Sequence, residues 1–258
     1  MSKWFIRPCK VDIGNMCRKM GINVPLALAL QSKGLNTPKK VKDYFNTENY
    51  NFGDITKLIG VKRSFEIIEK AINERKKIFI YGDYDVDGVT STVILYKSLK
   101  ALGADVFYYI PNRVKDDYGL NVNAIERLIE KGMDLLITCD NGIAAIEEIK
   151  YAKEKGINVV IYDHHEPVIK DGKEVLPEAD SVTDAKIENC GYDFTVMCAG
   201  GLCYRVMKAF YEYLGEKYTL EEEMVIFAGI ATVCDVVDLI GENRAIAKRS
   251  LGLINANI

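Results

Sequence analysis

The chain has 258 residues, of which 48% are hydrophobic and 28% charged, a composition typical of a globular protein. No run of about 18 apolar residues occurs, and the N-terminal MSKWFIRPCK lacks the apolar stretch of a signal peptide, so we expect a cytoplasmic protein without a membrane partner. The formal charge of −3 gives no global attraction to nucleic acid, although a local basic groove is compatible with it.

Residues 1–60 are expected to form a helical N-terminal cap. An apolar stretch covers residues 24–30, and Thr37-Pro38 is typical of a helix start because proline fits the first helical turn. The pattern changes after this segment. Residues 61–258 are therefore assigned to a second domain.

From residue 64 onward, amphipathic helices alternate with short apolar runs rich in β-forming residues. Continuously apolar runs are typical of parallel strands buried on both faces of a sheet. The predicted fold class is α/β, with a mostly parallel five-stranded sheet flanked by helices and followed by C-terminal helices. We expect helices near 64–75, 89–102, 122–131, 143–155, 196–215, 220–233 and from 243, strands at KIFIY, ADVFYYI, DLLITC and NVVIY, and a loop-rich stretch up to about residue 193.

The first acidic segment, GDYDVDG at residues 82–88, follows the strand KIFIY. Asp83, Asp85 and Asp87 recur at every second position, so an extended chain would point them to one side, where they repel one another. A divalent cation would remove this repulsion, and oxygen ligands suit Mg²⁺ or Mn²⁺. The alternative is a solvated acidic turn. An EF-hand calcium loop is excluded, because apolar residues stand where its final glutamate should be.

Asp140 follows the strand DLLITC and precedes Asn141 and Gly142, where a helix is expected to begin. A carboxylate at this crossing can bridge ions, and the helix N-terminus offers backbone amides to an anion. The alternative for Asp140 is a helix N-cap. Gly200 and Gly201, at another expected helix start, either receive a phosphate on their amides or allow close helix packing.

Both histidines of the chain stand side by side after the strand NVVIY, preceded by Asp163. Adjacent side chains diverge in an extended chain, so one histidine faces the metals. We assign His164 as the metal ligand and His165 to a supporting or phosphate-contacting role. Asp163 would orient an imidazole.

Asp235 lies in the apolar segment ATVCDVVDL, where an unpaired carboxylate is costly. A bound metal would remove this cost, whereas Asp238 is the competing candidate and a helix cap is the alternative role. Motifs of other enzyme classes are absent: the chain has no phosphate-binding G-x-x-x-x-G-K-[ST], no G-x-G-x-x-G after a strand and no G-x-S-x-G. Nucleoside triphosphate hydrolysis and serine hydrolase chemistry are therefore disfavoured.

Four segments, YGDYDVDGVTST, TCDNGI, YDHHEP and ATVCDVVDLIGENR, resemble in order and interval the motifs of the DHH phosphoesterase superfamily. The segments KWFIRP, YYIPNRVKDDYGLN and GENR are similar to the RecJ single-strand-specific exonucleases. The resemblance covers essentially the whole chain. It implies that residues 61–258 form the catalytic domain and that the family's C-terminal substrate-binding domain lies outside this chain.

The resemblance also implies a set of ligands for two ions. Asp85 and Asp140 would hold one ion, supported by Asp83. The other ion would be held by Asp87, Asp140, His164 and Asp235, so Asp140 bridges the two. Many superfamily members have a histidine where this chain has Tyr81, which implies a weaker or water-completed site for the first ion.

The implied reaction is two-metal hydrolysis, in which Mn²⁺ or Mg²⁺ ions about 3.5–4 Å apart generate a hydroxide and stabilise the entering and leaving oxygens. A RecJ-like protein would release 5′-mononucleotides from single-stranded DNA in the 5′-to-3′ direction, in DNA repair and recombination. Single-stranded DNA is the implied partner, together with a helicase or single-strand-binding protein, and a monomer is expected. Weak or absent processive activity is expected of this chain alone.

Arg113 and Arg244 are candidates for phosphate contacts, because guanidinium groups match phosphate geometry. Asn141 and Gly142 are candidates through the backbone amides of the expected helix N-terminus. For Arg205 a surface salt bridge is the simpler interpretation. Two other functions stay open: hydrolysis of short oligoribonucleotides, cyclic dinucleotides or adenosine bisphosphate, and a non-catalytic nucleic-acid-binding scaffold. The segments YGLN and GENR favour the exonuclease over the former, and the intact acidic motifs argue against the latter.

Overall fold

The computed structural model describes residues 12–48, 50–112 and 119–256. The chain divides into two compact units, Met1–Tyr50 and Asn51–Ile258. This division precedes the boundary expected near residue 60, because Ile55 and Leu58 are buried in the core of the larger unit.

The smaller unit contains helices α1 (Ile13–Met20), α2 (Val24–Ser32) and α3 (Pro38–Phe45). Each begins after a side chain that accepts a hydrogen bond from the amide three residues ahead, an N-cap that satisfies one of the free amides of the first turn. These caps are Asp12, Asn23 and Thr37. The helix start predicted at Thr37-Pro38 is therefore confirmed.

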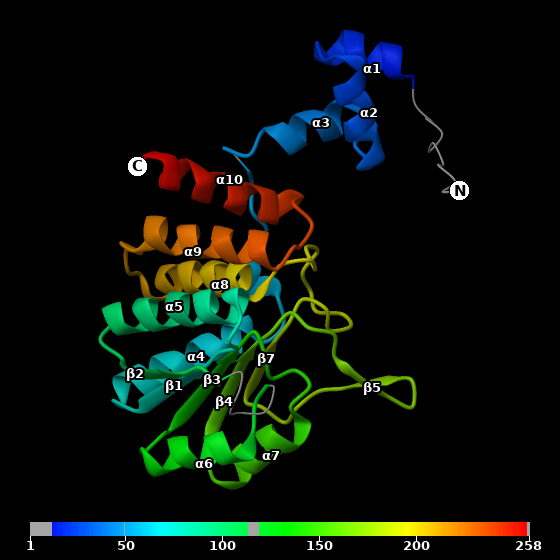
Figure 1. Cartoon of the computed structure of the whole chain (residues 1–258). Coiled ribbons are helices and arrows are strands. Elements are labelled where there is room, and N and C mark those ends of the chain that lie inside the picture. Colours follow the sequence, from blue (N-terminus) through cyan, green and yellow to red (C-terminus); the bar gives the residue numbers. More distant parts are fainter. Residues whose placement is uncertain (1–11, 49, 113–118, 257–258) are drawn as a thin grey trace. The chain divides into compact units, whose positions relative to one another are not determined.

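The larger unit is built on a five-stranded parallel sheet (Figure 1), which confirms the predicted fold class. Its order is β2-β1-β3-β4-β7. The strands are β1 (Lys77–Tyr81), β2 (Asp105–Tyr109), β3 (Leu135–Cys139), β4 (Asn158–Tyr162) and β7 (Ser181–Thr183).

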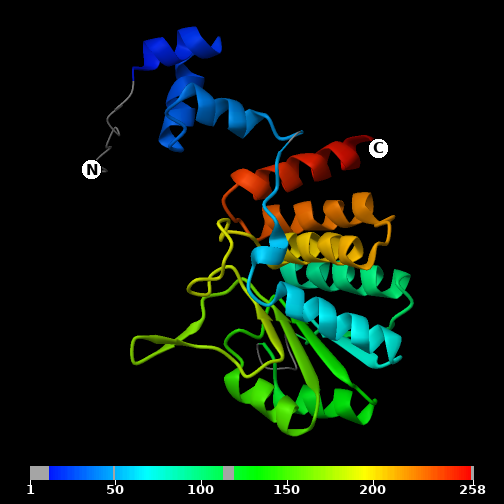
Figure 2. The same cartoon turned by 180° about the vertical axis from the view of Figure 1, so that it is seen from behind.

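Helices cover both faces of this sheet, as Figures 1 and 2 show from opposite sides. Alternate strand residues enter different cores: Ile78 and Ile80 face one layer of helices, and Phe79 and Tyr81 face the other. The first layer holds α4 (Val61–Asn73), α5 (Val86–Ala101) and α8 (Ala199–Leu214), with α9 (Glu221–Cys234) and α10 (Gly241–Ala256) beyond them. The second holds α6 (Val122–Glu130) and α7 (Ile146–Glu154).

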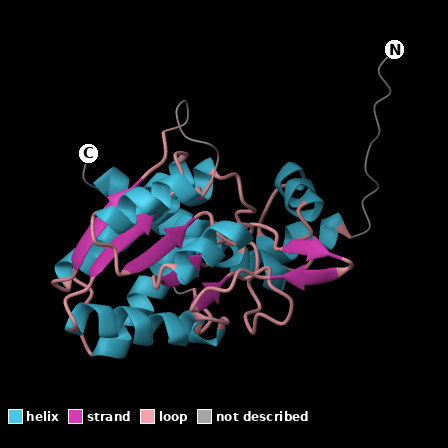
Figure 3. Cartoon of the chain, turned by 90° about the horizontal axis from the view of Figure 1, so that it is seen from below, coloured by secondary structure: helices cyan, strands magenta, loops and turns pink. Residues whose placement is uncertain are grey.

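The stretch expected to be loop-rich contains strands that the sequence did not reveal. β5 (Val168–Lys170) and β6 (Lys173–Val175) form an antiparallel hairpin, visible in Figure 3, and β7 adds the fifth strand to the sheet. Each of these strands is three residues long, which is too short for a recognisable alternation of polar and apolar residues.

The strand order places a crevice at the carboxyl ends of β1 and β3. The chain leaves β1 for β2 on one side and later returns to β3 on the other, so the crossovers diverge at this point and leave space for a ligand. Asp83 follows β1 and Asp140 follows β3. Among the described residues, no helix has the length and apolarity of a membrane span.

Gly60 at the start of α4 tests the packing of β7 against the helical layer. Its φ is +83°, and a Cβ there would lie 2.2 Å from the Val182 carbonyl oxygen. Gly60→Ala should lower the free energy of unfolding by about 2–4 kcal/mol, measured by urea denaturation. Gly103 is the matched control, with φ +81° and nothing within 4 Å of the added Cβ. Gly103→Ala should cost only about 1 kcal/mol, and equal losses would contradict the packing argument.

Candidate metal centre

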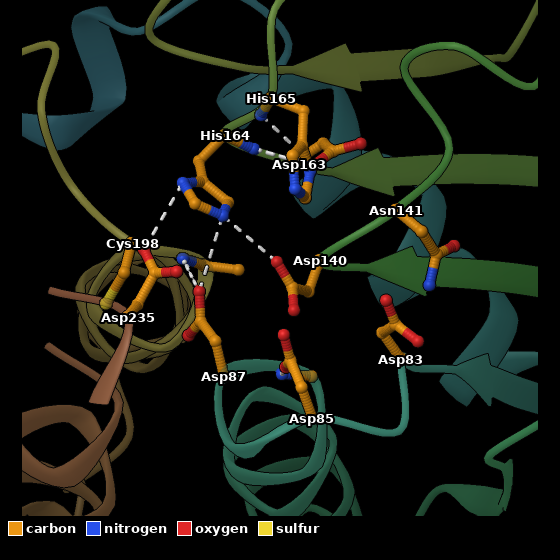
Figure 4. A network of polar contacts seen from close by, with 12 residues as sticks. Asp83, Asp85, Asp87, Asp140, Asn141, Asp163, His164, His165, Cys198 and Asp235 are labelled. Carbon is orange, nitrogen blue, oxygen red and sulfur yellow. Dashed lines mark hydrogen bonds and ion pairs between the residues drawn. The ribbon is translucent and has the colours of Figure 1, made fainter. Parts of the chain in front are cut away.

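The first three aspartates approach the site from the β1–α5 connection (Figure 4). An extended chain was considered for this segment on sequence grounds, but the chain turns into α5 after Asp85. Asp85 is the N-cap of α5, where its carboxylate accepts a hydrogen bond from the Gly88 amide at 2.9 Å, and Asp87 lies in the first helical turn. Asp83 and Asp87 are both 2% exposed, so the carboxylates converge although the backbone has turned into a helix.

Asp87 is held by the N-terminus of α8. Its carboxylate accepts hydrogen bonds from the amides of Ala199 at 2.8 Å and Gly200 at 2.7 Å, a position where the helix dipole favours a negative charge. A Cβ on Gly200 would lie 2.5 Å from the Cβ of Ala231. Of the two interpretations of this glycine pair, the structure therefore favours close packing, and the amide of Gly200 binds a side chain of the protein.

Asp140 occupies the centre of the site. Its φ of +62° is unusual for a residue other than glycine, and such strain is concentrated at functional sites. The carboxylate is 3% exposed, and its Oδ1 lies 3.0 Å from Nε2 of His164. The backbone amide donates to the carbonyl of Tyr162, which fixes the turn after β3 to the neighbouring strand β4.

The two histidines have different partners. The imidazole of His164 places Nε2 within 3.4 Å of Asp87 and Nδ1 within 3.9 Å of Asp235. His165 instead pairs its Nδ1 with Oδ1 of Asp163 at 2.8 Å. The aspartate thus orients the second imidazole, while the other carboxylate oxygen accepts the amide of Ile143 at 2.9 Å.

Asp235 ends α9, and its carboxylate faces His164, as Figure 4 shows. Asp238, the competing candidate, is exposed in the turn that follows. Geometry therefore brings the former into the site and leaves the latter outside it.

Three overlapping groups of side chains present ligand atoms within 4.8 Å of one another. These groups are Asp83, Asp85 and Asp140; Asp87, His164 and Asp235; and Asp140, His164 and His165. Hard carboxylate oxygens, alone or with one or two imidazoles, suit Mg²⁺ or Mn²⁺. The third group shares Asp140 with the first and His164 with the second, as expected for neighbouring ions.

Burial and mutual repulsion raise the pKa values of four carboxylates of the site, those of Asp83, Asp87, Asp140 and Asp235. The pKa of Asp140 rises to about 10, first through burial and then through the negative charges of Asp87 and Asp85. Burial also raises the pKa values of Asp83, Asp87 and Asp235. A site that disfavours its own negative charge in this way is stabilised by cations.

Asp163 behaves differently from the carboxylates around it. Burial alone would raise its pKa, but hydrogen bonds from His165, Ile143 and His164 outweigh this effect and lower the pKa. The hydrogen bond between His165 and Asp163 also raises the pKa of His165. Asp163 is therefore a stable negative partner for an imidazole.

Tyr81 points away from the carboxylates. Its hydroxyl donates to the carbonyl of Gly119 at 3.0 Å and accepts from Nδ2 of Asn121 at 3.3 Å, on the face of the sheet covered by α6. The ring is fully buried against Tyr109. The group of Asp83, Asp85 and Asp140 is thus formed without a side chain from position 81.

The substrate-binding candidates have different surroundings. Asn141 and Gly142 line a cavity of about 330 Å³ beside Asp140 and His165. The Asn141 side chain turns inward, donating to the carbonyl of Cys139 at 3.1 Å. Arg244 lies in the first turn of α10 and is partly buried, and Arg113 lies outside the described residues.

Arg205 forms an ion pair, as expected, but the pair is buried rather than on the surface. Its Nε donates to Glu242 at 3.1 Å, and the guanidinium stacks on Phe52 with 4.5 Å to the ring centroid. The pair joins α8 to α10.

Two residues near the site were missed by the sequence argument. Asp184 follows β7 and is fully buried, and burial raises its pKa to about 7. Lys186, two positions later, pairs with Glu166 at 3.2 Å, and its charge acts on both Asp184 and Asp235. The available signal was an aspartate after SVT, the same strand-end pattern that located Asp140 and Asp163.

The fold and this arrangement of carboxylates and histidines define a class of protein. The chain belongs to the DHH family: the model of that family's N-terminal domain matches residues 77–232. This confirms the resemblance found in the motifs.

Individual relatives extend the similarity. The single-stranded-DNA-specific exonuclease RecJ of Bacillus subtilis (strain 168) is 38% identical over 252 residues, 97% of this chain and 30% of that protein. A crystal structure of exonuclease RecJ bound to manganese is 31% identical, with a TM-score of 0.70 over 80% of this chain and 50% of that one. RecJ from Thermus thermophilus, in complex with Mn²⁺, is 27% identical, with a TM-score of 0.75 over 96% and 34%. The chain spans about a third of the length of the curated relatives it matches.

The raised pKa of Asp140 predicts how the metal-free chain responds to pH. Because the folded-state pKa of about 10 lies above the ordinary aspartate value of 3.8, the stability from this group is full below 3.8 and is lost as pH rises toward 10. In EDTA at pH 8, Asp140→Asn should therefore raise the free energy of unfolding by on the order of 1–3 kcal/mol.

Urea denaturation of both proteins across pH 5–9 measures this difference, which should shrink toward acidic pH. In saturating Mn²⁺ the wild type should have the higher free energy of unfolding, because the variant lacks one charged metal ligand. A difference that does not change with pH would contradict the assignment of the effect to Asp140.

Proposed function

We propose that this chain is the catalytic part of a metal-dependent, single-strand-specific 5′-to-3′ DNA exonuclease of RecJ type that releases 5′-mononucleotides. The observation that carries the proposal is the convergence of buried aspartates and a histidine pair at the switch point of a DHH-family sheet. Relatives of this chain are named for single-stranded-DNA-specific exonuclease activity. Similar RecJ structures contain manganese.

The donor set fits two divalent ions. Asp83, Asp85 and Asp140 would hold one ion; Asp87, Asp140, His164 and Asp235 would hold the other. Oxygen-rich ligands with a neutral imidazole are the set expected for Mn²⁺ or Mg²⁺. Asp140 bridges in this scheme, since it belongs to the carboxylate group and also contacts His164. Bound there, the ions would activate a water and stabilise charge on the phosphoryl oxygens.

The protein's own residues would position the substrate around these ligands. Asp163 fixes the ring of His165 through Nδ1, which leaves Nε2 for a phosphate oxygen, and this side chain is 46% exposed. The amides of Asn141 and Gly142 have no acceptor within the described part of the chain and line the cavity beside Asp140 and His165. They belong to the loop before α7, which begins at Ile146, so the expected helix N-terminus does not lie at these amides. Arg113 and Arg244 stay candidates for further phosphate contacts.

The substrate, protein partners, oligomeric state and location of this chain are proposals. We propose single-stranded DNA as substrate, a helicase or single-strand-binding protein as partner, a monomeric state and a cytoplasmic location. The N-terminal helices and the DHH domain are proposed as separate domains, with a further substrate-binding domain in the complete protein.

End-labelled DNA tests the direction of hydrolysis. With the full-length protein and Mn²⁺, a 5′ label on single-stranded DNA should appear at once as a mononucleotide, whereas a 3′ label should remain on a ladder of shortening strands. Duplex DNA, short RNA and cyclic dinucleotides serve as competing substrates, and Asp140→Ala is the inactive control, because it removes the bridging ligand. Equal loss of label from both ends would contradict the directional exonuclease, and preference for a cyclic dinucleotide would favour the other DHH activity.

A further inference from the structure

Asn243 connects two loops that flank the metal centre. It lies in the first turn of α10 and is fully buried. Its side-chain Nδ2 donates to the carbonyl of Val196 at 2.7 Å and to the carbonyl of Asp238 at 3.0 Å. A buried amide with two main-chain acceptors on different loops fixes the distance between them, because breaking either bond leaves a buried polar group unpaired.

The first of these loops carries the amides that hold Asp87. Val196 precedes Cys198, the N-cap of α8, whose next amides, those of Ala199 and Gly200, bind the Asp87 carboxylate. A shift of this loop would move those donors. The position of Asp87 therefore depends on where the Val196 segment lies.

The second loop carries Asp235. The next residue, Val236, has a φ of +58°, a strained conformation for a β-branched side chain, and it is 85% exposed, so no packing offsets the strain. A hydrogen bond from Asn243 to Asp238 holds this turn two residues further along. The orientation of the Asp235 carboxylate depends on the same turn.

The backbone of Asn243 is itself fixed by its neighbour Glu242. That carboxylate is 2% exposed, accepts from Nε of Arg205 at 3.1 Å and from the Gly53 amide at 3.2 Å, and also binds the hydroxyl of Tyr192. The start of α10 is thus attached to α8 and to residues 51–54. Asn243 therefore projects from a rigid position, as a distance-setting side chain requires.

We propose that Asn243 is a positioning residue for one of the two ions only. The proposal rests on the proposed function. The amide joins the loops behind Asp87 and Asp235, which together with His164 form one ligand group. The other group, centred on Asp83 and Asp85, comes from the β1–α5 connection, whereas both hydrogen bonds of the Asn243 amide within the described residues go to the Val196 and Asp238 carbonyls.

Calorimetric titration of the 258-residue chain with Mn²⁺ tests this inference. The wild type should bind two ions. Asn243→Ala should weaken one of them by about 10- to 100-fold, the range for supporting residues around a metal, and leave the other unchanged. Asn243→Ser, which keeps one donor, replaces this variant if the alanine protein does not fold.

Ser250 provides the matched control on the same helix. It is 2% exposed and donates to the carbonyl of Ile226 at 3.0 Å, far along α10 from the loops described above. Ser250→Ala should lower stability without changing either Mn²⁺ affinity. A general loss of stability would change the Mn²⁺ affinities of both variants in the same way, so this comparison separates positioning of the ion from stability of the fold.

A double-mutant cycle identifies the affected ion. In an Asp235→Asn background, Asn243→Ala should have a smaller effect on Mn²⁺ binding, limited to what acts through Asp87, whereas in an Asp85→Asn background its full effect should persist. Unchanged affinities in Asn243→Ala, or equal weakening of both ions, would overturn the inference. A wild type that binds no Mn²⁺ would instead contradict the proposed function, and the inference with it.

Discussion

Mutual repulsion of buried carboxylates is the constraint on which this structure depends. Asp83, Asp87 and Asp140 are all nearly inaccessible, and the pKa of Asp140 rises to about 10 because burial and its neighbours disfavour its charge. A protein designed for stability alone would replace such a cluster with apolar residues. Retaining the cluster costs folding free energy in the absence of cations, and divalent cations offset that cost by binding.

Besides the two histidines, the fold holds these carboxylates with backbone amides rather than with lysine or arginine side chains. The N-terminus of α8 binds Asp87, the Gly88 amide binds Asp85, and the Ile143 amide binds Asp163. Backbone donors keep each carboxylate in place without neutralising it, so the charge stays available to an ion. The parallel sheet completes the arrangement, because its switch point brings the ends of β1 and β3 together.

Much of the fold and the site could be predicted from sequence, for physical reasons that differ between elements. β1, β3 and β4 are continuous apolar runs followed within two residues by aspartate, so both the strands and Asp140 were recognisable. The turn of the chain into α5 at Asp85 was not, because alternation in sequence does not reveal where an extended segment becomes helical. The partners of Tyr81 and Arg205 depend on residues far away in the sequence, which no local pattern encodes.

Two ions are expected to occupy two ligand groups that share Asp140. Anomalous diffraction from crystals of this chain soaked in Mn²⁺ tests this arrangement most directly. Two peaks about 3.5–4 Å apart are expected, one among Asp83, Asp85 and Asp140 and the other among Asp87, Asp140, His164 and Asp235. A single peak, or peaks that do not share Asp140, would contradict this arrangement.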